Sequence, residues 1–181
     1  MARLDPARFP WFDERQALNQ HLGVVIRTIP LFSTTGGQFA TGDVLFCNAE
    51  IENAVPVAGG TSRLIGISIH NKDNEAAIQD ILFHQVNSYE LGTTNAAVDI
   101  SDDDFRAMKH LGLHYTGSND WKSIVNGYYY TAGSNTDEKS PSILLQAETG
   151  STSVYFSVIL RDNPAFASIS DLQYIFHIEY R

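Results

Sequence analysis

The chain has 181 residues, 43% of them hydrophobic and 11% aromatic, so it is long enough for one domain that buries roughly 70% of the surface exposed by its unfolded form. Its formal net charge of −9 argues against a protein that wraps or tracks nucleic acid, because nonspecific affinity for nucleic acid comes from neutralising phosphates with Lys and Arg. Its single cysteine, Cys47, excludes an intrachain disulfide and a paired-thiolate metal site.

Residues 1–22 differ in kind from the rest and are predicted to form an N-terminal arm. Phe9, Trp11 and Phe12 lie there among charges that sum to zero. Burying the three rings would contribute on the order of 15 kcal/mol, whereas ordering about ten residues costs ~10–20 kcal/mol. The arm is therefore expected to order fully only against a surface that also supplies hydrogen bonds, either the chain's own body or a partner. Prolines interrupt the apolar residues of this segment, so no export signal is expected.

From residue 24 onward the pattern is that of many short strands separated by turns. The predicted strands cover residues 24–29, 43–47, 51–57, 63–70, 76–86, 113–116, 124–131, 142–147, 153–161 and 172–180. In strand 63–70, Ile65, Ile67 and Ile69 are expected to share one face, and strands 153–161 and 172–180 alternate in the same way. This pattern predicts an all-β domain over residues 23–181, a β-sandwich or jelly roll with one short helix. The longest apolar run, residues 22–32, is too short to span a bilayer.

One segment fits two kinds of secondary structure, and another is predicted to be a loop. Residues 76–86 fit a helical stripe as well as a strand, and a strand is preferred because the turn-prone segment 71–74 can close a hairpin with strand 63–70. Residues 133–140 are small and polar, which predicts a mobile loop.

One helix start is well marked. Ser101 is the expected N-cap with Asp104 at the third helical position, and Ile100 can pack on Phe105 across the cap. The helix is expected to run over residues 102–110 and to close one end of the sandwich.

Asp99 and Asp102–Asp104 form the densest cluster of carboxylates. Helix-dipole stabilisation of anions explains these residues, and calcium binding remains the alternative, although the spacing lacks the D-x-D-x-D-G pattern of a calcium loop. The six histidines are scattered, and there is no G-x-S-x-G elbow and no glycine-rich phosphate loop. A Ser-His-Asp site is not dismissed by these absences, but no enzyme activity, cofactor or metal is expected.

The aromatic residues Trp121, Tyr128, Tyr129 and Tyr130 form the group most open to a binding role. On a strand, Tyr128 and Tyr130 share one face and Tyr129 lies on the other. Two interpretations stand beside burial in the core: stacking on a sugar ring, or contact in a subunit interface, where Tyr and Trp are enriched.

The order of short motifs between residues 28 and 116 resembles structural proteins of tailed bacteriophages. The motifs are Gly42-Asp43-Val44-Leu45-Phe46, Glu50-Ile51-Glu52-Asn53-Ala54-Val55, Gly59-Gly60-Thr61-Ser62, Arg63 to His70, Leu91-Gly92-Thr93 and the helix start from Ile100 to Phe105. The resemblance implies a capsid decoration (cement) protein with a β-sandwich body. Such a protein is expected to bind the major capsid protein as a homotrimer on the outer surface of the virion head, after assembly in the host cytoplasm, and to bind neither nucleic acid nor membrane.

The arm is not part of this pattern, and its role is a separate hypothesis. Phe9, Trp11 and Phe12 are expected to anchor the protein on the capsid, with Arg3 and Arg8 contacting acidic groups of the shell. Two other functions remain open. The first is a carbohydrate- or receptor-binding module of a head fibre or tail, which would use Trp121 and Tyr128 to Tyr130. The second is a hydrolase or isomerase built on a β-sandwich.

Overall fold

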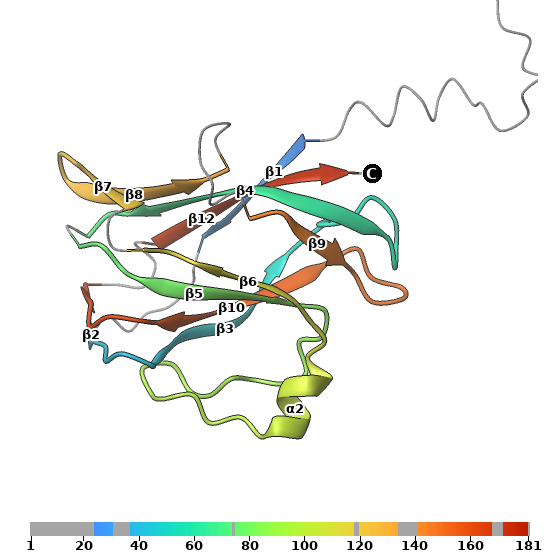
Figure 1. Ribbon diagram of the computed structural model, residues 1–181, viewed down its shortest axis with the longest axis horizontal. Helices are drawn as coiled ribbons and strands as arrows, with labels where there is room; N and C mark the ends of the chain where they lie inside the picture. Colours follow the sequence, from blue (N-terminus) through green and yellow to red (C-terminus); the bar gives the residue numbers. More distant parts are fainter. Residues whose placement is uncertain are drawn as a thin grey trace, which may run out of the picture.

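The protein is an all-β sandwich, as the strand pattern predicts (Figure 1). The computed structural model describes residues 24–30, 37–73, 75–117, 120–133, 141–167 and 172–180, with only the backbone for 24–30. The predicted arm, including Arg3, Arg8, Phe9, Trp11 and Phe12, lies outside the described residues. Residues 134–140 of the predicted mobile loop lie outside them as well.

Two antiparallel sheets form the layers of the sandwich. The six-stranded sheet has the order β1 (Val24–Pro30), β12 (Leu172–Tyr180), β4 (Thr61–Asn71), β8 (Gly127–Ala132) and β7 (Trp121–Ile124), with β9 (Ile143–Gln146) paired to β4. The four-stranded sheet has the order β3 (Val44–Ile51), β10 (Val154–Leu160), β5 (Gln79–His84) and β6 (His110–Tyr115). A small ladder joins β2 (Gly37–Gln38) to β11 (Ala165–Phe166). The first described strand and the last one thus lie side by side in one sheet.

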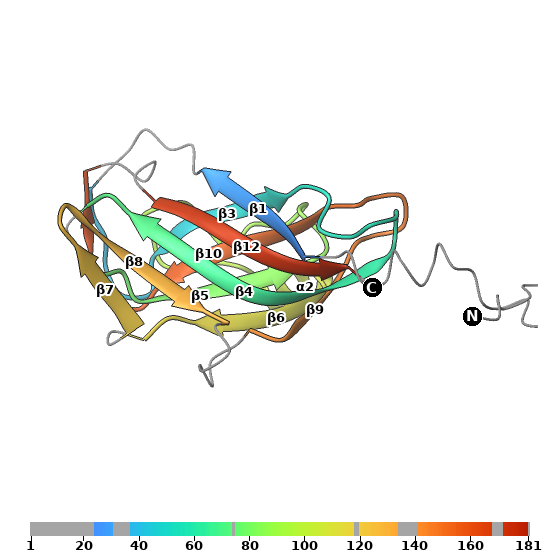
Figure 2. The same ribbon diagram turned by 90° about the horizontal axis from the view of Figure 1, so that it is seen from above.

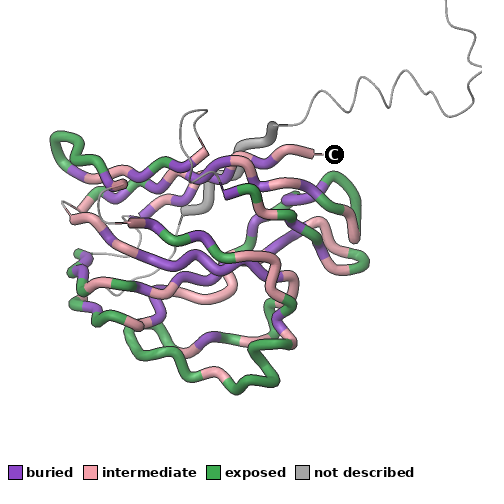
Figure 3. Tube along the Cα trace, in the orientation of Figure 1, coloured by how far each residue is buried: buried purple, intermediate pink, exposed green. Residues whose placement is uncertain are grey.

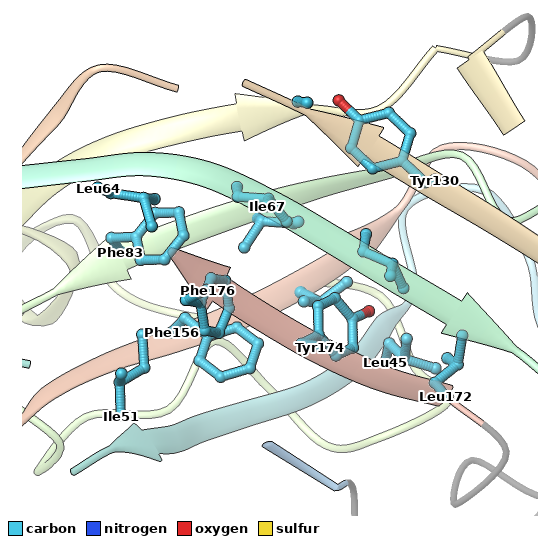
Figure 4. Packing of buried hydrophobic residues seen from close by; sticks show 14 of the residues in the cluster. Leu45, Ile51, Leu64, Ile67, Phe83, Tyr130, Phe156, Leu172, Tyr174 and Phe176 are labelled. Atoms are coloured by element: carbon cyan, nitrogen blue, oxygen red, sulfur yellow. The ribbon is translucent and has the colours of Figure 1, made fainter. Parts of the chain in front are cut away.

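The core between the sheets is built around aromatic rings. The ring of Phe156 lies 4.9 Å from that of Phe176, 5.2 Å from Phe46 and 5.3 Å from Tyr174, measured between centroids. Figure 4 shows several of these side chains meeting from both sheets. The predicted alternation in β10 and β12 is confirmed. The inward residues are fully buried at Val154, Phe156, Val158 and Leu160 and at Leu172, Tyr174, Phe176 and Ile178.

In β4 the predicted alternation holds for only part of the strand. Ile67 and Ile69 are fully buried, but Ile65 is only half-buried. The register of β4 against β12 passes from Leu64 directly to Gly66, so a β-bulge turns Ile65 away from the core and puts Leu64 into it. A bulge inserts one residue into the two-residue period, and the inward face changes on either side of it.

The predicted hairpin between strand 63–70 and strand 76–86 is wrong. β4 belongs to the six-stranded sheet and β5 to the four-stranded one. Asn71 ends β4, where its side-chain amide donates to the carbonyl of Glu75 and its oxygen accepts from the amide of Asp73. This side chain holds the turn that carries the chain from one sheet to the other.

Two other strand predictions fail at turns. β3 ends at Ile51, and residues 52–60 are a turn and loop instead of a strand. Within it, Asn53 has a φ of 49° and Gly59 a φ of 70°, both in the left-handed region that a strand cannot use. The predicted strand 124–131 is a hairpin, because the chain turns at residues 125–126 between β7 and β8.

The one described helix, α2 (Asp102–Ala107), is shorter than predicted. Ser101 is its N-cap as expected, with its hydroxyl accepting from the amide of Asp104 at 3.2 Å. The helix stops before Lys109, which has a φ of 54°, and His110 already begins β6.

The helix also lies elsewhere than predicted. It belongs to the segment 85–109, which packs on the outer face of the four-stranded sheet (Figure 1), although no residue of α2 itself is buried. Leu91 and Met108 of this segment pack with Val44 and Leu82 of the sheet in a second apolar cluster. All six residues of β5 are buried: the core covers one face of the strand, and on the other face Leu82 packs on the segment and Asp80 pairs with Arg161.

Candidate interaction surfaces

Two of the four candidate aromatic residues are buried in the structure. Tyr130 is fully buried and Trp121 is 5% exposed, and they pair across β8 and β7 with ring centroids 5.7 Å apart. The Tyr130 hydroxyl lies 2.6 Å from Nε2 of His114, inside the sandwich. Trp121 and Tyr130 are therefore core residues, as the interpretation of burial in the core expects. Tyr128 is half-buried and packs against the same core.

Tyr129 alone of the four lies on the outer face of the six-stranded sheet. The pairing register places it opposite Lys122 of β7 on one side and His70 of β4 on the other, and His70 is in turn opposite Gln173 of β12. Lys122 and His70 are exposed, and Tyr129 and Gln173 are half-buried. These four residues, the outer row, run straight across four neighbouring strands. Figure 2 looks onto the sheet that carries them.

The outer face differs in charge from the rest of the described surface. Its charged residues are Lys122, Arg63 and Glu179, and His70 and His177 lie on it as well. Arg63 and Glu179 are cross-strand neighbours in the register, so opposite charges meet there. The described carboxylates that lie on other strands and loops are Asp43, Glu50, Glu52, Asp73, Glu75, Asp80, Glu90, Asp99, Asp102, Asp103, Asp104, Glu148 and Asp162.

A second surface is apolar and lies along one flank of the sandwich. Leu113 and Tyr115 of β6 are 55% and 53% exposed, and Leu144 of β9 is 57% exposed. β6 and β9 belong to different sheets but run next to each other along this flank (Figure 2). Their close approach requires Gly112, since a Cβ there would lie 2.9 Å from the side chain of Ile143. We call Leu113, Tyr115 and Leu144 the apolar flank.

The tip of the β7–β8 hairpin also exposes apolar side chains. It is the exposed loop at the far left of Figure 3. Ile124 is 51% exposed and Val125 is 98% exposed. Gly127 follows the tip, and a Cβ there would lie 2.4 Å from the carbonyl oxygen of Asn71. The hairpin is thus held closely against the end of β4 while its tip projects.

The structure contains a serine–histidine pair that the sequence did not indicate, but both residues are fully buried. His84 Nε2 lies 3.0 Å from the hydroxyl oxygen of Ser157, and Nδ1 lies 2.8 Å from the carbonyl oxygen of Val86. That hydroxyl oxygen also accepts from the amide of Asn48 at 3.0 Å. The pair therefore joins β5, β10, β3 and the start of the covering segment 85–109. It holds the segment in place and presents no nucleophile to solvent.

His84 is expected to make the protein less stable in acid. Burial, assisted by the nearby His110, lowers the pKa of His84 to about 4 from the 6.5 of the unfolded chain. Since the unfolded state binds the proton more readily, the contribution of neutral His84 is complete above about pH 6.5 and declines as the pH falls toward 4, by on the order of 3 kcal/mol. Urea unfolding at pH 7.5 and pH 4 measures this. The variant His84→Gln, which cannot titrate, should lose most of that difference, and an unchanged difference would contradict the assignment.

Two of the carboxylates around α2, Asp103 and Asp104, have partners in the helix or at its N-cap. The Ser101 hydroxyl donates to Asp104 at 2.8 Å, and Arg106 pairs with Asp103 at 3.3 Å. These contacts agree with anions placed at a helix N-terminus. Among the described residues no group of three or more His, Cys, Asp or Glu side chains is arranged to hold a metal ion.

No protein family, curated protein or solved structure matches this chain. No helix in the described part is long and apolar enough to cross a membrane.

Proposed function

We propose that this protein is a structural component of a tailed-phage virion, a decoration (cement) protein that binds the outer surface of the head as a homotrimer and bridges major capsid subunits. The resemblance of residues 28–116 to phage structural proteins supports the proposal. A β-sandwich is the body that this resemblance implies, and it suits a protein that must be rigid and must act by contact.

The observation that carries the proposal is the apolar flank. Leu113, Tyr115 and Leu144 keep more than half of their surface in water, and burying what is exposed would contribute about 1 kcal/mol for each side chain. β6 is also an edge strand. The opposite edge of its sheet, β3, is bridged by residues 94–97, whereas β6 pairs only with β5 among the described strands. In the proposed trimer this flank faces the neighbouring copy.

Some polar side chains of the interior bond to one another, which favours a structural role for them. His114 bonds to Tyr130, and Tyr174 donates to the side chain of Gln79 within the core. Burial raises the pKa of the Cys47 thiol, which makes the reactive thiolate scarcer at neutral pH. These contacts give the body the stiffness that a shell-binding protein needs.

Removal of residues 1–12 tests the proposal. β1 pairs with β12 over seven residues, so the chain preceding Val24 is attached to a rigid sheet. We expect the shortened protein to melt at the temperature of the full chain and to lose coating of phage heads, because Phe9, Trp11 and Phe12 are the proposed anchors. The measurement is copy number per particle by quantitative gel analysis of purified heads. The control is Phe105→Ala, which removes a surface ring from α2 and should keep the copy number. Undiminished coating by the shortened protein would refute the role of the arm.

A carbohydrate- or receptor-binding module is the second candidate, and Tyr129 is the observation that favours it. This ring lies on the outer face beside His70, which is in turn opposite Gln173, and a ring in line with polar side chains suits a sugar ring. Binding on a glycan array that Tyr129→Ala abolishes would support this function.

A further inference from the structure

We propose that residues 85–109, the strap, form a cover that acid releases: when His84 takes up a second proton, the strap leaves the outer face of the four-stranded sheet while both sheets stay folded. The strap connects β5 to β6 and includes α2, and it runs along the lower edge of Figure 1 and Figure 3. This device belongs to the sandwich itself and does not depend on the proposed function.

Both ends of the strap are held at the same point. The amides of Gln85 and Val86 each donate to the carbonyl oxygen of Met108 at 3.2 Å. Directly beyond this point β5 pairs with β6, and His84 is opposite His110 in the register. A loop with joined ends is a unit of its own. The strap can therefore leave the sheet without separating any two of the named strands.

Few buried contacts hold the strap on the sheet. Among its residues, all of which the structure describes, the buried ones are Leu91 and Met108, which pack on Val44 and Leu82. The other strap residues are half-buried or exposed, including every residue of α2. A segment with so little buried apolar surface opens at a lower free energy than the sheets of the core.

His84 binds the first turn of the strap from below. It is the last residue of β5 and shares the outer face of the sheet with Leu82. Its Nδ1 lies 2.8 Å from the carbonyl oxygen of Val86 and must carry a proton to donate there, because a carbonyl group only accepts. Nε2 therefore accepts from the hydroxyl of Ser157, which lies 3.0 Å away.

Asn48 extends this network along the strap. Its amide donates to the Ser157 hydroxyl oxygen at 3.0 Å, and its side chain donates at 3.1 Å to two strap carbonyl groups, those of Asn87 and Tyr89. A second proton on His84 turns Nε2 from an acceptor into a donor. The Ser157 oxygen then meets two donors, and its own proton loses its acceptor. The bonds that join the strap to β10 and β3 are therefore weakened together.

The surroundings of His84 oppose a positive charge. The ring is fully buried between His110 of β6 and Tyr155 of β10, whose centroid lies 6.2 Å away. Two carboxylates act on Tyr155: Glu50, which is exposed, and Glu148, which pairs with the last strap residue at 2.9 Å. Among the described residues no carboxylate bonds to His84. Burial, assisted by His110, lowers the pKa of His84 to about 4.

His110 lies at the other end of the strap and packs on its helix. The ring of His110 is 4.0 Å from the ring of Phe105 in α2, measured between centroids. Burial lowers the pKa of His110 as well. A charge on either histidine therefore disfavours a charge on the other while the strap is closed, because they are opposite each other across β5 and β6.

The open strap takes up the proton more readily than the closed one. Once the strap has left, water reaches His84 and its pKa returns toward the usual 6.5. Opening is therefore favoured progressively as the pH falls below 6.5, and the gain levels off near pH 4. Between pH 7.5 and pH 5 the equilibrium constant for opening should rise by up to about 30-fold.

Release exposes apolar side chains. Val44 and Leu82 lie under the strap, and Leu82 is opposite Leu113 of the apolar flank in the register of β5 and β6. In acid the apolar flank thus extends onto the outer face of the four-stranded sheet. A larger apolar patch favours association with another apolar surface.

Hydrogen exchange of the full chain, followed by mass spectrometry, tests the release. The amide of Asn95 in the strap donates to the carbonyl oxygen of Val44. Relative to intrinsic exchange rates, protection of such strap amides should fall about 10- to 30-fold from pH 7.5 to pH 5. At both pH values the strap should be at least about 100-fold less protected than β4 and β12 in the same sample.

Two variants connect the change to His84. His84→Gln cannot gain the proton and should lose most of the pH dependence in the strap. The matched control is His70→Gln, which replaces an exposed histidine on the other sheet and should keep it.

The single cysteine gives a second measurement that needs no variant. Cys47 Sγ lies 3.6 Å from the carbonyl oxygen of Gly92 in the strap. Its reaction with dithiodipyridine, taken relative to the unfolded chain at the same pH, should accelerate about tenfold from pH 7.5 to pH 5.

Three results would overturn the proposal. Equal protection of strap and sheets would mean that the strap opens only when the whole domain unfolds. Strap protection that does not change with pH would exclude a response to acid, and an undiminished change in His84→Gln would exclude His84 as its origin. If His84→Gln does not fold, the wild-type comparison of strap with sheets and the Cys47 rates still decide between these outcomes.

Discussion

Replacing Phe156 with alanine is expected to lower the free energy of unfolding by about 3–5 kcal/mol. Phe156 is fully buried, and its ring contacts rings from both sheets, among them Phe83 and Phe176. Removing it deletes apolar surface from the core and leaves a cavity that rigid neighbouring rings cannot fill. Urea unfolding followed by tryptophan fluorescence measures the change, because Trp121 lies in the same core.

The matched control is Phe105→Ala, which removes the same side chain from α2, where it is 38% exposed. We expect that variant to lose no more than about 1 kcal/mol. If the two substitutions shifted the unfolding midpoint equally, the aromatic cluster around Phe156 would not be the centre of the core.

Replacing Gly133 with alanine is expected to have the second largest effect, about 3 kcal/mol. Gly133 has a φ of 98°, in the left-handed region that favours glycine. An added Cβ would also lie 2.2 Å from the carbonyl oxygen of Ile65 and 2.7 Å from the Cα of Gly66. Both atoms belong to the backbone of the β4 bulge, so they cannot move aside as a flexible side chain would. Thermal unfolding by circular dichroism measures the loss.

Gly150→Ala separates backbone strain from steric clash in this prediction. Gly150 has a similar φ of 89°, but an added Cβ there would meet no heavy atom within 4 Å beyond its chain neighbours. We expect Gly150→Ala to cost about 1–2 kcal/mol, the strain alone. If Gly133→Ala were no more destabilising than this variant, the close approach of Gly133 to the bulge would be refuted.

The fold class and several faces could be predicted from the sequence because local alternation determined them. In β10 and β12 every second residue is apolar. A shift of the register by one residue would turn Phe156 and Tyr174 toward solvent, so only one register buries them. The cap of α2 was also readable, because Ser101 and Asp104 bond to each other within one turn. Such features depend on neighbours a few residues away.

What could not be predicted depends on contacts distant in the sequence. The bulge at Ile65 is defined by pairing with β12, more than a hundred residues later, and nothing in the Ile-rich pattern indicates it. The hairpin expected between β4 and β5 fails because each strand pairs with partners elsewhere in the chain.

The candidate site shows the same limit. Strand periodicity correctly separated Tyr129 from Tyr128 and Tyr130. It could not tell which face is the core, because both faces of β8 carry large aromatic residues. The outer row could not be predicted for a related reason. Lys122, His70 and Gln173 are on different strands, and only the sheet register places them in one row with Tyr129. The serine–histidine pair likewise joins two strands 73 residues apart.

The central claim is that this β-sandwich works by adhesion to a phage head, and a cryo-electron microscopy map of the virion tests it most directly. We predict density for the sandwich on the outside of the shell, with the apolar flank against a neighbouring copy. Density for this protein only in the tail, or a virion without it, would contradict the claim.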